Sequence, residues 1–169
     1  MDIYRTLQTI VKGSRYNLDR NRAEEPIVII RGVRHFGHSL TEDEILRTLR
    51  PRIILTEDLV DSRYIAADDR FEPGNFYRTG ASPIQRNLMD DAPLLSAGRH
   101  LKIDVVGIGS TDHFSDLEEE GYLFSQIAAQ AQRGELLYAT VGHNHIMPSS
   151  ELIQKLNASE ISGVILRMK

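Results

Sequence analysis

The chain has 169 residues, of which 41% are hydrophobic and 26% are charged, so it can form one globular domain with a hydrophobic core. Its formal net charge of −4 argues against nucleic acid as the main partner, and the absence of cysteine excludes disulfides and thiolate metal sites. No stretch approaches the ~20 apolar residues of a membrane helix. The first residues also lack the features of a signal peptide, so we expect a cytoplasmic protein without membrane contact.

The order of elements along the chain predicts the fold class. Residues 2–13 have the spacing of an amphipathic helix, and the polar, aperiodic residues 14–25 predict a loop, so we expect residues 1–26 to precede a core of residues 27–169. Five short apolar runs predict strands that are buried on both faces. These runs are residues 27–30, 53–55, 103–108, 136–141 and 163–168. With helical segments between them, they predict a single α/β domain with a mostly parallel sheet of about five strands and helices on both faces.

The clearest helix start follows the third predicted strand. Ser115 and Glu118 have the spacing of a capping box, in which each side chain bonds to the backbone of the other residue. Apolar side chains then recur at helical intervals. They are Leu123, Phe124, Ile127, Ala128 and Ala131. This pattern predicts a helix that packs on the sheet through one apolar stripe.

Polar residues gather where the predicted strands end. In open α/β sheets, ligands bind outside the carboxyl ends of the strands. Five of the six histidines and several carboxylates lie directly after strands: His35 and His38 after the first, Glu57 and Asp58 after the second, Asp112 and His113 after the third, and His143 and His145 after the fourth. We therefore expect the functional site at this edge of the sheet.

The pattern Gly-x-x-His occurs twice, from Gly32 to His35 and from Gly142 to His145. Imidazole nitrogens with one carboxylate are the usual ligands of a catalytic divalent metal where thiolates are absent, and Glu57 can supply that carboxylate. Each glycine would let the backbone turn sharply off its strand and would leave room for a ligand. The sequence therefore predicts a metal site.

Each of these residues also has a simpler interpretation. His143 and His145 could form a hydrogen-bonded turn, Glu57 could cap a helix or pair with an arginine, and His38 could only shape the entry to the next helix. The metal site further requires the first and fourth predicted strands to lie close together. The order of elements along the chain does not decide this.

The sequence resembles the Tiki/TraB superfamily, which includes ChaN-like and erythromycin-esterase-like proteins. The resemblance rests on GVRHFGHS, then RPRIILTEDLVDSRY, then ELLYATVGHNHI. In that superfamily two Gly-x-x-His motifs, an acidic residue after the second strand and an arginine soon after it mark the site. The matching positions here are Gly32 with His35, Glu57, Arg63, and Gly142 with His145. One segment differs: FSDLEEEGYLF, residues 114–124, has no arginine where TraB-like proteins usually carry one.

The resemblance implies a divalent-metal-dependent hydrolase, peptidase-like in the Tiki branch. We predict that His35 and His145 hold the ion, which would be manganese, cobalt or zinc. Glu57 would be the third ligand or the base that takes a proton from bound water, whose pKa a divalent ion lowers to ~7. Arg63 would orient Glu57 or bind the developing oxyanion. The substrate would be a peptide or a small molecule with an amide or ester bond.

His38 and His143 would act as auxiliary ligands or as partners of the ligands. Two other functions stay open at this point. ChaN-like members bind haem, so the same pocket could hold haem or another small ligand without catalysis. The chain could also be an inert scaffold that keeps only the fold. A homo-oligomer is compatible with all three functions.

Overall fold

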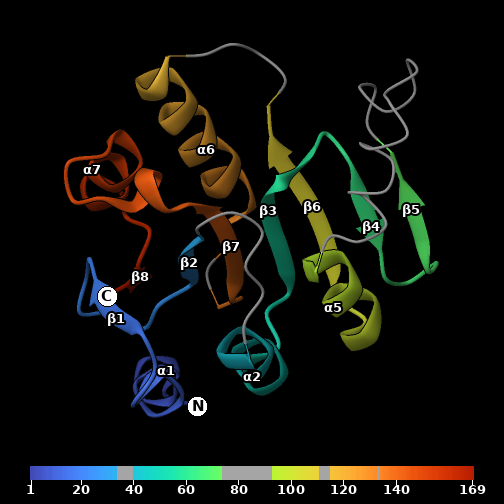
Figure 1. The fold of residues 1–169 in the computed structure, drawn as a ribbon, viewed down its shortest axis with the longest axis horizontal. Coiled ribbons are helices and arrows are strands. Elements are labelled where there is room, and N and C mark those ends of the chain that lie inside the picture. Colours follow the sequence, from blue (N-terminus) through green and yellow to red (C-terminus); the bar gives the residue numbers. More distant parts are fainter. Residues whose placement is uncertain (34–39, 74–92, 111–114, 133) are drawn as a thin grey trace.

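The computed structural model describes residues 1–33, 40–73, 93–110, 115–132 and 134–169. Within these residues, eight strands form one sheet in the order β1-β8-β2-β7-β3-β6-β4-β5, which Figure 1 shows from left to right. The strands are β1 (Tyr16–Arg20), β2 (Val28–Val33), β3 (Ile53–Val60), β4 (Arg63–Ile65), β5 (Arg70–Glu72), β6 (Asp104–Gly109), β7 (Leu137–Gly142) and β8 (Gly163–Met168).

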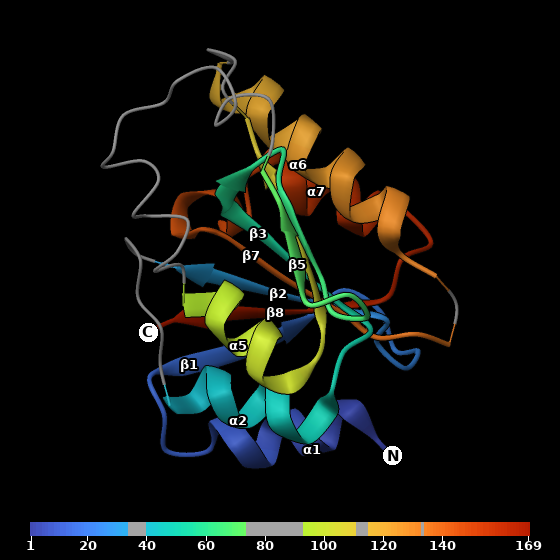
Figure 2. The ribbon, with the colours of Figure 1, turned by 90° about the vertical axis from the view of Figure 1, so that its right-hand side faces the viewer.

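Helices cover both faces of this sheet, as predicted (Figure 2). One face carries α1 (Ile3–Val11), α2 (Leu40–Leu49) and α5 (Pro93–Leu101), and the other carries α6 (Asp116–Gln130) and α7 (Glu151–Ala158). A 3₁₀-helix, η1 (His143–Ile146), joins β7 to α7. Each face has its own apolar core because side chains alternate along the strands: Ile29 packs with α1, α2 and α5, and Ile30 packs with α6 and α7.

The sheet as a whole is mixed, so the prediction of a mostly parallel sheet of about five strands is wrong. The five predicted strands do form its centre, where β8, β2, β7, β3 and β6 are neighbours and run parallel. The prediction missed the strands at the two edges, where β1 is antiparallel to β8 and β4 and β5 form an antiparallel hairpin beside β6. These strands are short or mostly exposed, so they carry no continuous apolar run.

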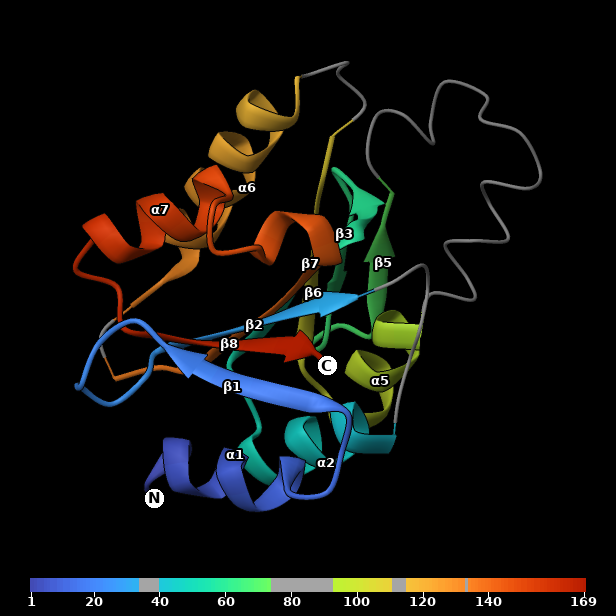
Figure 3. The same cartoon turned by 60° about the vertical axis from the view of Figure 1, so that its left-hand side comes forward.

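Strand β1 gives the N-terminal segment a defined place at one edge of the sheet. Residues 14–25 were predicted to be a loop, but Tyr16–Arg20 pairs with β8 in continuous register from Tyr16↔Met168 to Arg20↔Val164. Figure 3 shows β1 running beside β8 at this edge. The N-terminal residues are therefore part of the same sheet and core as the rest of the described chain. Tyr16 is buried against α1 and α2, which explains why a largely polar segment is held in place.

A buried polar network ties four elements together on the α2 face. Arg31 of β2 forms an ion pair with Glu42 of α2 at 2.5 Å and donates hydrogen bonds to the hydroxyl of Tyr16 at 2.8 and 3.0 Å. The hydroxyl of Tyr138, in β7, donates to Glu42 at 2.9 Å. Burial, and after it the charge of Glu42, raises the pKa of Tyr138, so this hydroxyl keeps its proton. The network fixes α2 against β1, β2 and β7.

Among the residues described above, no helix is both long enough and apolar enough to cross a membrane.

Candidate metal centre

The strand order brings the two Gly-x-x-His segments to the same place. Strands β2 and β7 are direct neighbours and parallel, with Gly32 opposite Val141 and Val33 opposite Gly142. The condition for His35 and His145 to meet is therefore satisfied at the level of the strands. His35 and His38 themselves, like Asp112 and His113, lie outside the described residues, so their predicted roles stay predictions.

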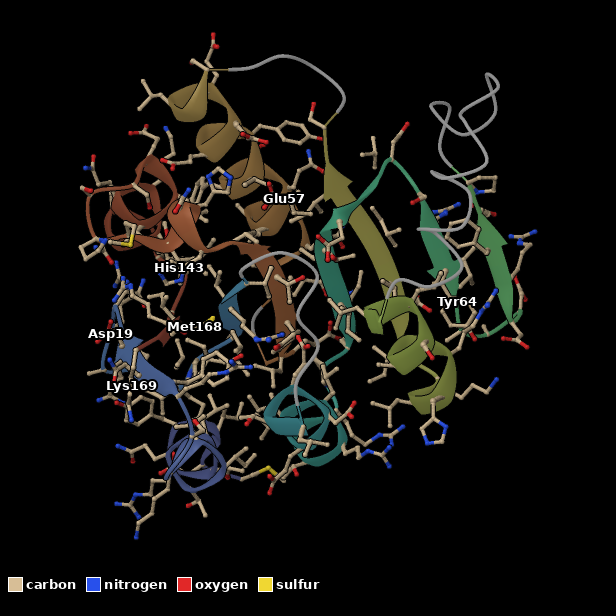
Figure 4. All side chains as sticks on the ribbon, viewed as in Figure 1. Asp19, Glu57, Tyr64, His143, Met168 and Lys169 are labelled. Carbon is tan, nitrogen blue, oxygen red and sulfur yellow. The ribbon has the colours of Figure 1, made fainter. Side chains whose placement is uncertain are left out.

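Glu57 lies within β3, in the part of the strand where the pairing with β6 shifts register between Thr56 and Val60. Its Oε2 accepts a hydrogen bond from the backbone N–H of Gly142 at 2.6 Å, and its Oε1 lies 3.4 Å from Nε2 of His145. Burial opposes ionisation of this carboxyl, but the bonds to His145 and Gly142 outweigh it, so the pKa of Glu57 is lowered. Glu57 is thus an ionised carboxylate held beside His145, and Figure 4 shows it between β3 and α6.

His145 lies in η1 with its side chain only 13% exposed, and carboxylates face both ring nitrogens. Nε2 lies 3.4 Å from Glu57 Oε1 and 3.9 Å from Glu119 Oε2, and Nδ1 lies 3.3 Å from Glu120 Oε1. The hydrogen bond to Glu57 raises the pKa of His145 to about 9, against the opposing effect of burial and with help from Glu120 and Glu119. Without a bound cation, the imidazolium itself therefore supplies the positive charge among these carboxylates.

The position of η1 depends on contacts from three sides. Ser150 Oγ donates to the carbonyl of His145 at 2.7 Å, and Arg167 Nε donates to the carbonyl of Ile146 at 2.6 Å. The side chain of Ile146 is fully buried against Gly32, where a Cβ would lie 2.3 Å from Ile146 Cδ1. η1 can therefore lie this close to β2 only because residue 32 has no side chain.

The two motif glycines serve close approach rather than a sharp turn. Gly142 has φ −53° and ψ 141°, values open to most residues, and neither motif glycine has a positive φ. A Cβ on Gly142 would lie 3.2 Å from Cδ2 of His145. The expectation that these glycines turn the backbone sharply is thus not supported. The expectation that they leave space is supported, but η1 fills the space at Gly32 and the ring of His145 fills it at Gly142.

We expect Gly32→Ala to destabilise the fold by about 1–3 kcal/mol, because the added methyl group overpacks the contact with Ile146. Urea unfolding of both proteins measures the loss. Gly121→Ala is the matched control: its Cβ would meet only Lys155 Cε at 3.6 Å within α6, where alanine favours the helix. Ile146→Val, which removes Cδ1, should restore part of the stability of Gly32→Ala. Equal effects of the two alanine substitutions would contradict the close-contact explanation.

Helix α6 supplies two carboxylates that the sequence did not predict. The capping box of Ser115 and Glu118 is confirmed, and it starts the helix so that Glu119 and Glu120 face η1. Glu120 is 9% exposed, and its Oε2 accepts a hydrogen bond from the backbone N–H of Glu151 at 2.6 Å. The burial of Glu120 could have been predicted from the sequence. Glu120 lies three residues before Leu123 and seven before Ile127, so it falls on the apolar stripe of the helix.

Arg63 lies away from this group. It begins β4, which is separated from β3 by β6, and its Nε forms an ion pair with Glu72 Oε2 of β5 at 2.5 Å. The structure therefore does not bring Arg63 together with Glu57, and its predicted catalytic role gains no geometric support. Tyr64, the next residue, is fully buried, and its hydroxyl donates a hydrogen bond to Asp69. Tyr64 therefore lies on the far side of β6 from Glu57 (Figure 4).

His143 is the first residue of η1, but it is not part of the group around His145. Its Nδ1 is buried and has no hydrogen-bond partner among the described residues. The donor atoms that lie close together belong instead to Glu57, Glu119 and His145, with one atom of each within 4.8 Å of the others. The auxiliary role predicted for His143 is thus untested, and Glu119 takes a place that the sequence did not assign.

Comparisons of the chain with family models, with curated proteins and with solved structures found no match. The resemblance to the Tiki/TraB superfamily therefore stays a prediction from the motifs. The segment of residues 114–124, which differs from that superfamily in lacking arginine, is the segment that contains Glu119 and Glu120.

Proposed function

We propose that this protein is a divalent-metal-dependent hydrolase that acts on a peptide bond or on a related amide or ester bond. The observation that carries the proposal is the position of His145 Nε2, 3.4 Å from Glu57 Oε1 and 3.9 Å from Glu119 Oε2 at the carboxyl edge of the parallel strands. One imidazole and two carboxylates are a donor set that suits manganese, cobalt or zinc. A peptidase-like activity is what the resemblance to the Tiki branch implies.

The residues around this position would have different roles in the proposed reaction. His145 and Glu57 would hold the ion, and Glu57 is fixed for this role because its other oxygen is bound to the N–H of Gly142. Glu119 would be the third donor, and as the more exposed carboxylate, at 32% against 22% for Glu57, it would take the proton of the attacking water. A bound divalent ion supplies Lewis-acid chemistry, because it polarises the carbonyl group under attack and makes water more acidic. His35 remains a predicted further ligand.

The first test is the metal content of the purified protein after incubation with manganese, cobalt or zinc, measured by mass spectrometry. We expect close to one ion per chain in the wild type and none in His145→Ala, because the variant loses the only imidazole of the described donor set. The matched control is His100→Ala, since His100 is exposed in α5 on the opposite face of the sheet. Full metal content in His145→Ala, or none in the wild type, would contradict the proposal.

The second test is hydrolysis of a panel of chromogenic anilides and esters, with and without a chelator. We expect chelation to abolish turnover and re-addition of the ion to restore it. With the ion in excess, so that the weakened donor set stays occupied, Glu119→Gln should lower kcat far more than KM, because an amide cannot take a proton. A rate that is unaffected by the chelator would argue against a metal-dependent enzyme.

A further inference from the structure

Glu120 is a buried carboxylate with both oxygens engaged. It is 9% exposed on the apolar stripe of α6, where Leu123 and Ile127 pack into the core. Its Oε1 lies 3.3 Å from Nδ1 of His145, and its Oε2 accepts the N–H of Glu151 at 2.6 Å. A buried carboxylate is costly unless its oxygens are bonded, and here both are. The side chain is therefore held between the first turn of α7 and the ring of His145.

The first residue of α7 fixes the position of the Glu120 side chain. Glu151 is the first residue of the helix, so its N–H has no partner within the helix and is free to bind a carboxylate. Ser150 caps the same helix by accepting the N–H of Ile153, and it also donates to the carbonyl of His145. Both the backbone and the ring of His145 are thus positioned from the N-terminus of α7.

The contact at Nδ1 decides which nitrogen of His145 faces Glu57. A neutral imidazole carries one proton, on either Nδ1 or Nε2, and only the nitrogen without the proton can bind a metal. When a cation takes the lone pair of Nε2, the proton stays on Nδ1, where Glu120 accepts it in a hydrogen bond. Without a cation, carboxylates face both nitrogens, and both carry a proton in the imidazolium. Carboxylate–histidine pairs of this kind orient metal ligands and strengthen them as bases.

We propose that Glu120 is the positioning residue of the site: it accepts a hydrogen bond from Nδ1 of His145, holds the ring with Nε2 toward Glu57 and Glu119, and connects the ring to the N-terminus of α7. Its effect on metal affinity rests on the proposed function, whereas its hydrogen bond to the Nδ1 proton does not. Glu119 and Glu120, though adjacent in α6, thus have different roles, because one faces Nε2 and the other faces Nδ1.

The test uses Glu120→Gln, which keeps the size of the side chain but replaces one oxygen by an amide nitrogen. Zinc affinity is measured by competition with a chromogenic chelator, and the Nδ1 proton of His145 by nitrogen–proton NMR of the ring in metal-free protein at pH 7 and in zinc-loaded protein. We expect zinc to bind about 10–100-fold more weakly, and the Nδ1 proton, which exchanges slowly with water in the wild type, to exchange faster in the variant. The matched control is Glu118→Gln, in the same turn, because glutamine also serves in a capping box.

A second variant tests the connection to α7 without touching α6. Glu151→Pro removes the N–H that binds Glu120, at the first helical position where proline is well tolerated, after an extended Ser150. We expect zinc affinity to fall by a smaller factor, on the order of a few-fold, while the helix is retained in the circular dichroism spectrum. Unchanged affinity would overturn the role of α7.

The outcomes separate this proposal from the proposed function. If Glu120→Gln binds zinc as tightly as the wild type and protects the Nδ1 proton equally well, Glu120 does not position the ring. If the wild type binds none of manganese, cobalt and zinc, the hydrolase proposal fails, but the Nδ1 proton of the metal-free protein still decides on Glu120. An Nδ1 proton that is protected from exchange in the wild type and exchanges faster in Glu120→Gln supports the inference, and one that exchanges freely in the wild type overturns it.

Discussion

Arg31→Met is expected to destabilise the fold by about 3–5 kcal/mol, because it breaks the buried ion pair between Arg31 and the carboxylate of Glu42 by removing one of the two charges. Arg31 is 3% exposed and Glu42 is 1% exposed, so water cannot replace the missing partner. The hydroxyl of Tyr16 also loses the two hydrogen bonds that Arg31 donates. Urea unfolding at pH 7, with the midpoint and slope compared with the wild type, measures the loss.

Two further variants give this prediction its controls. Arg47→Met removes an exposed arginine of α2 and should change stability by no more than about 0.5 kcal/mol. Arg31→Met combined with Glu42→Leu removes both charges, and replacing a buried ion pair by apolar residues is often nearly neutral. The double variant should therefore be more stable than Arg31→Met alone. A loss below about 1 kcal/mol in the single variant would show that Glu42 becomes neutral or reaches water at little cost.

The central strands could be predicted because each is a run of apolar residues buried on both faces, a property that the local sequence carries by itself. The edge strands could not. β1 alternates only weakly and exposes most of its side chains. What makes it a strand is its pairing with β8, whose residues lie 144 to 152 positions further along the sequence. Pairing at such separation leaves no local pattern, so β1 was predicted to be a loop. Strands β4 and β5, with three residues each, are too short for a pattern.

Some residues of the candidate site could likewise be predicted from the sequence, and others could not. Glu57 and His145 follow directly from their positions at the ends of apolar runs, and the structure brings them within 3.4 Å of each other. Glu119 and Glu120 follow no strand directly, and their place beside His145 depends on α6 packing against α7 and η1. Arg63 shows the opposite case: it is six residues from Glu57 in the sequence, but the chain reverses and places it two strands away. Nearness in the sequence is thus a poor guide where a strand ends in a turn.

The stability of the metal-free protein is expected to fall by about 3 kcal/mol as the pH rises from 6.5 to 9, through the loss of one proton from His145. The folded protein raises the pKa of this group from 6.5 to about 9, so the folded state binds the proton more tightly than the unfolded state does. The resulting stabilisation is fully present below pH 6.5 and is lost as the pH passes the folded value. Urea unfolding in a chelator, at intervals of half a pH unit, measures this dependence.

His145→Gln provides the reference, because the difference between wild type and variant removes the contribution of every other titrating group. The wild type should lose its advantage over the variant between pH 6.5 and 9, and a difference that stays constant with pH would contradict the ion pair with Glu57. The same proton competes with a cation for Nε2, since a metal ligand must be deprotonated. If the proposed site binds zinc, its apparent affinity should therefore rise by about tenfold per pH unit over this range. The imidazolium and the divalent ion are thus alternative positive charges for one group of carboxylates, and the pH determines which of them Glu57 and Glu119 face.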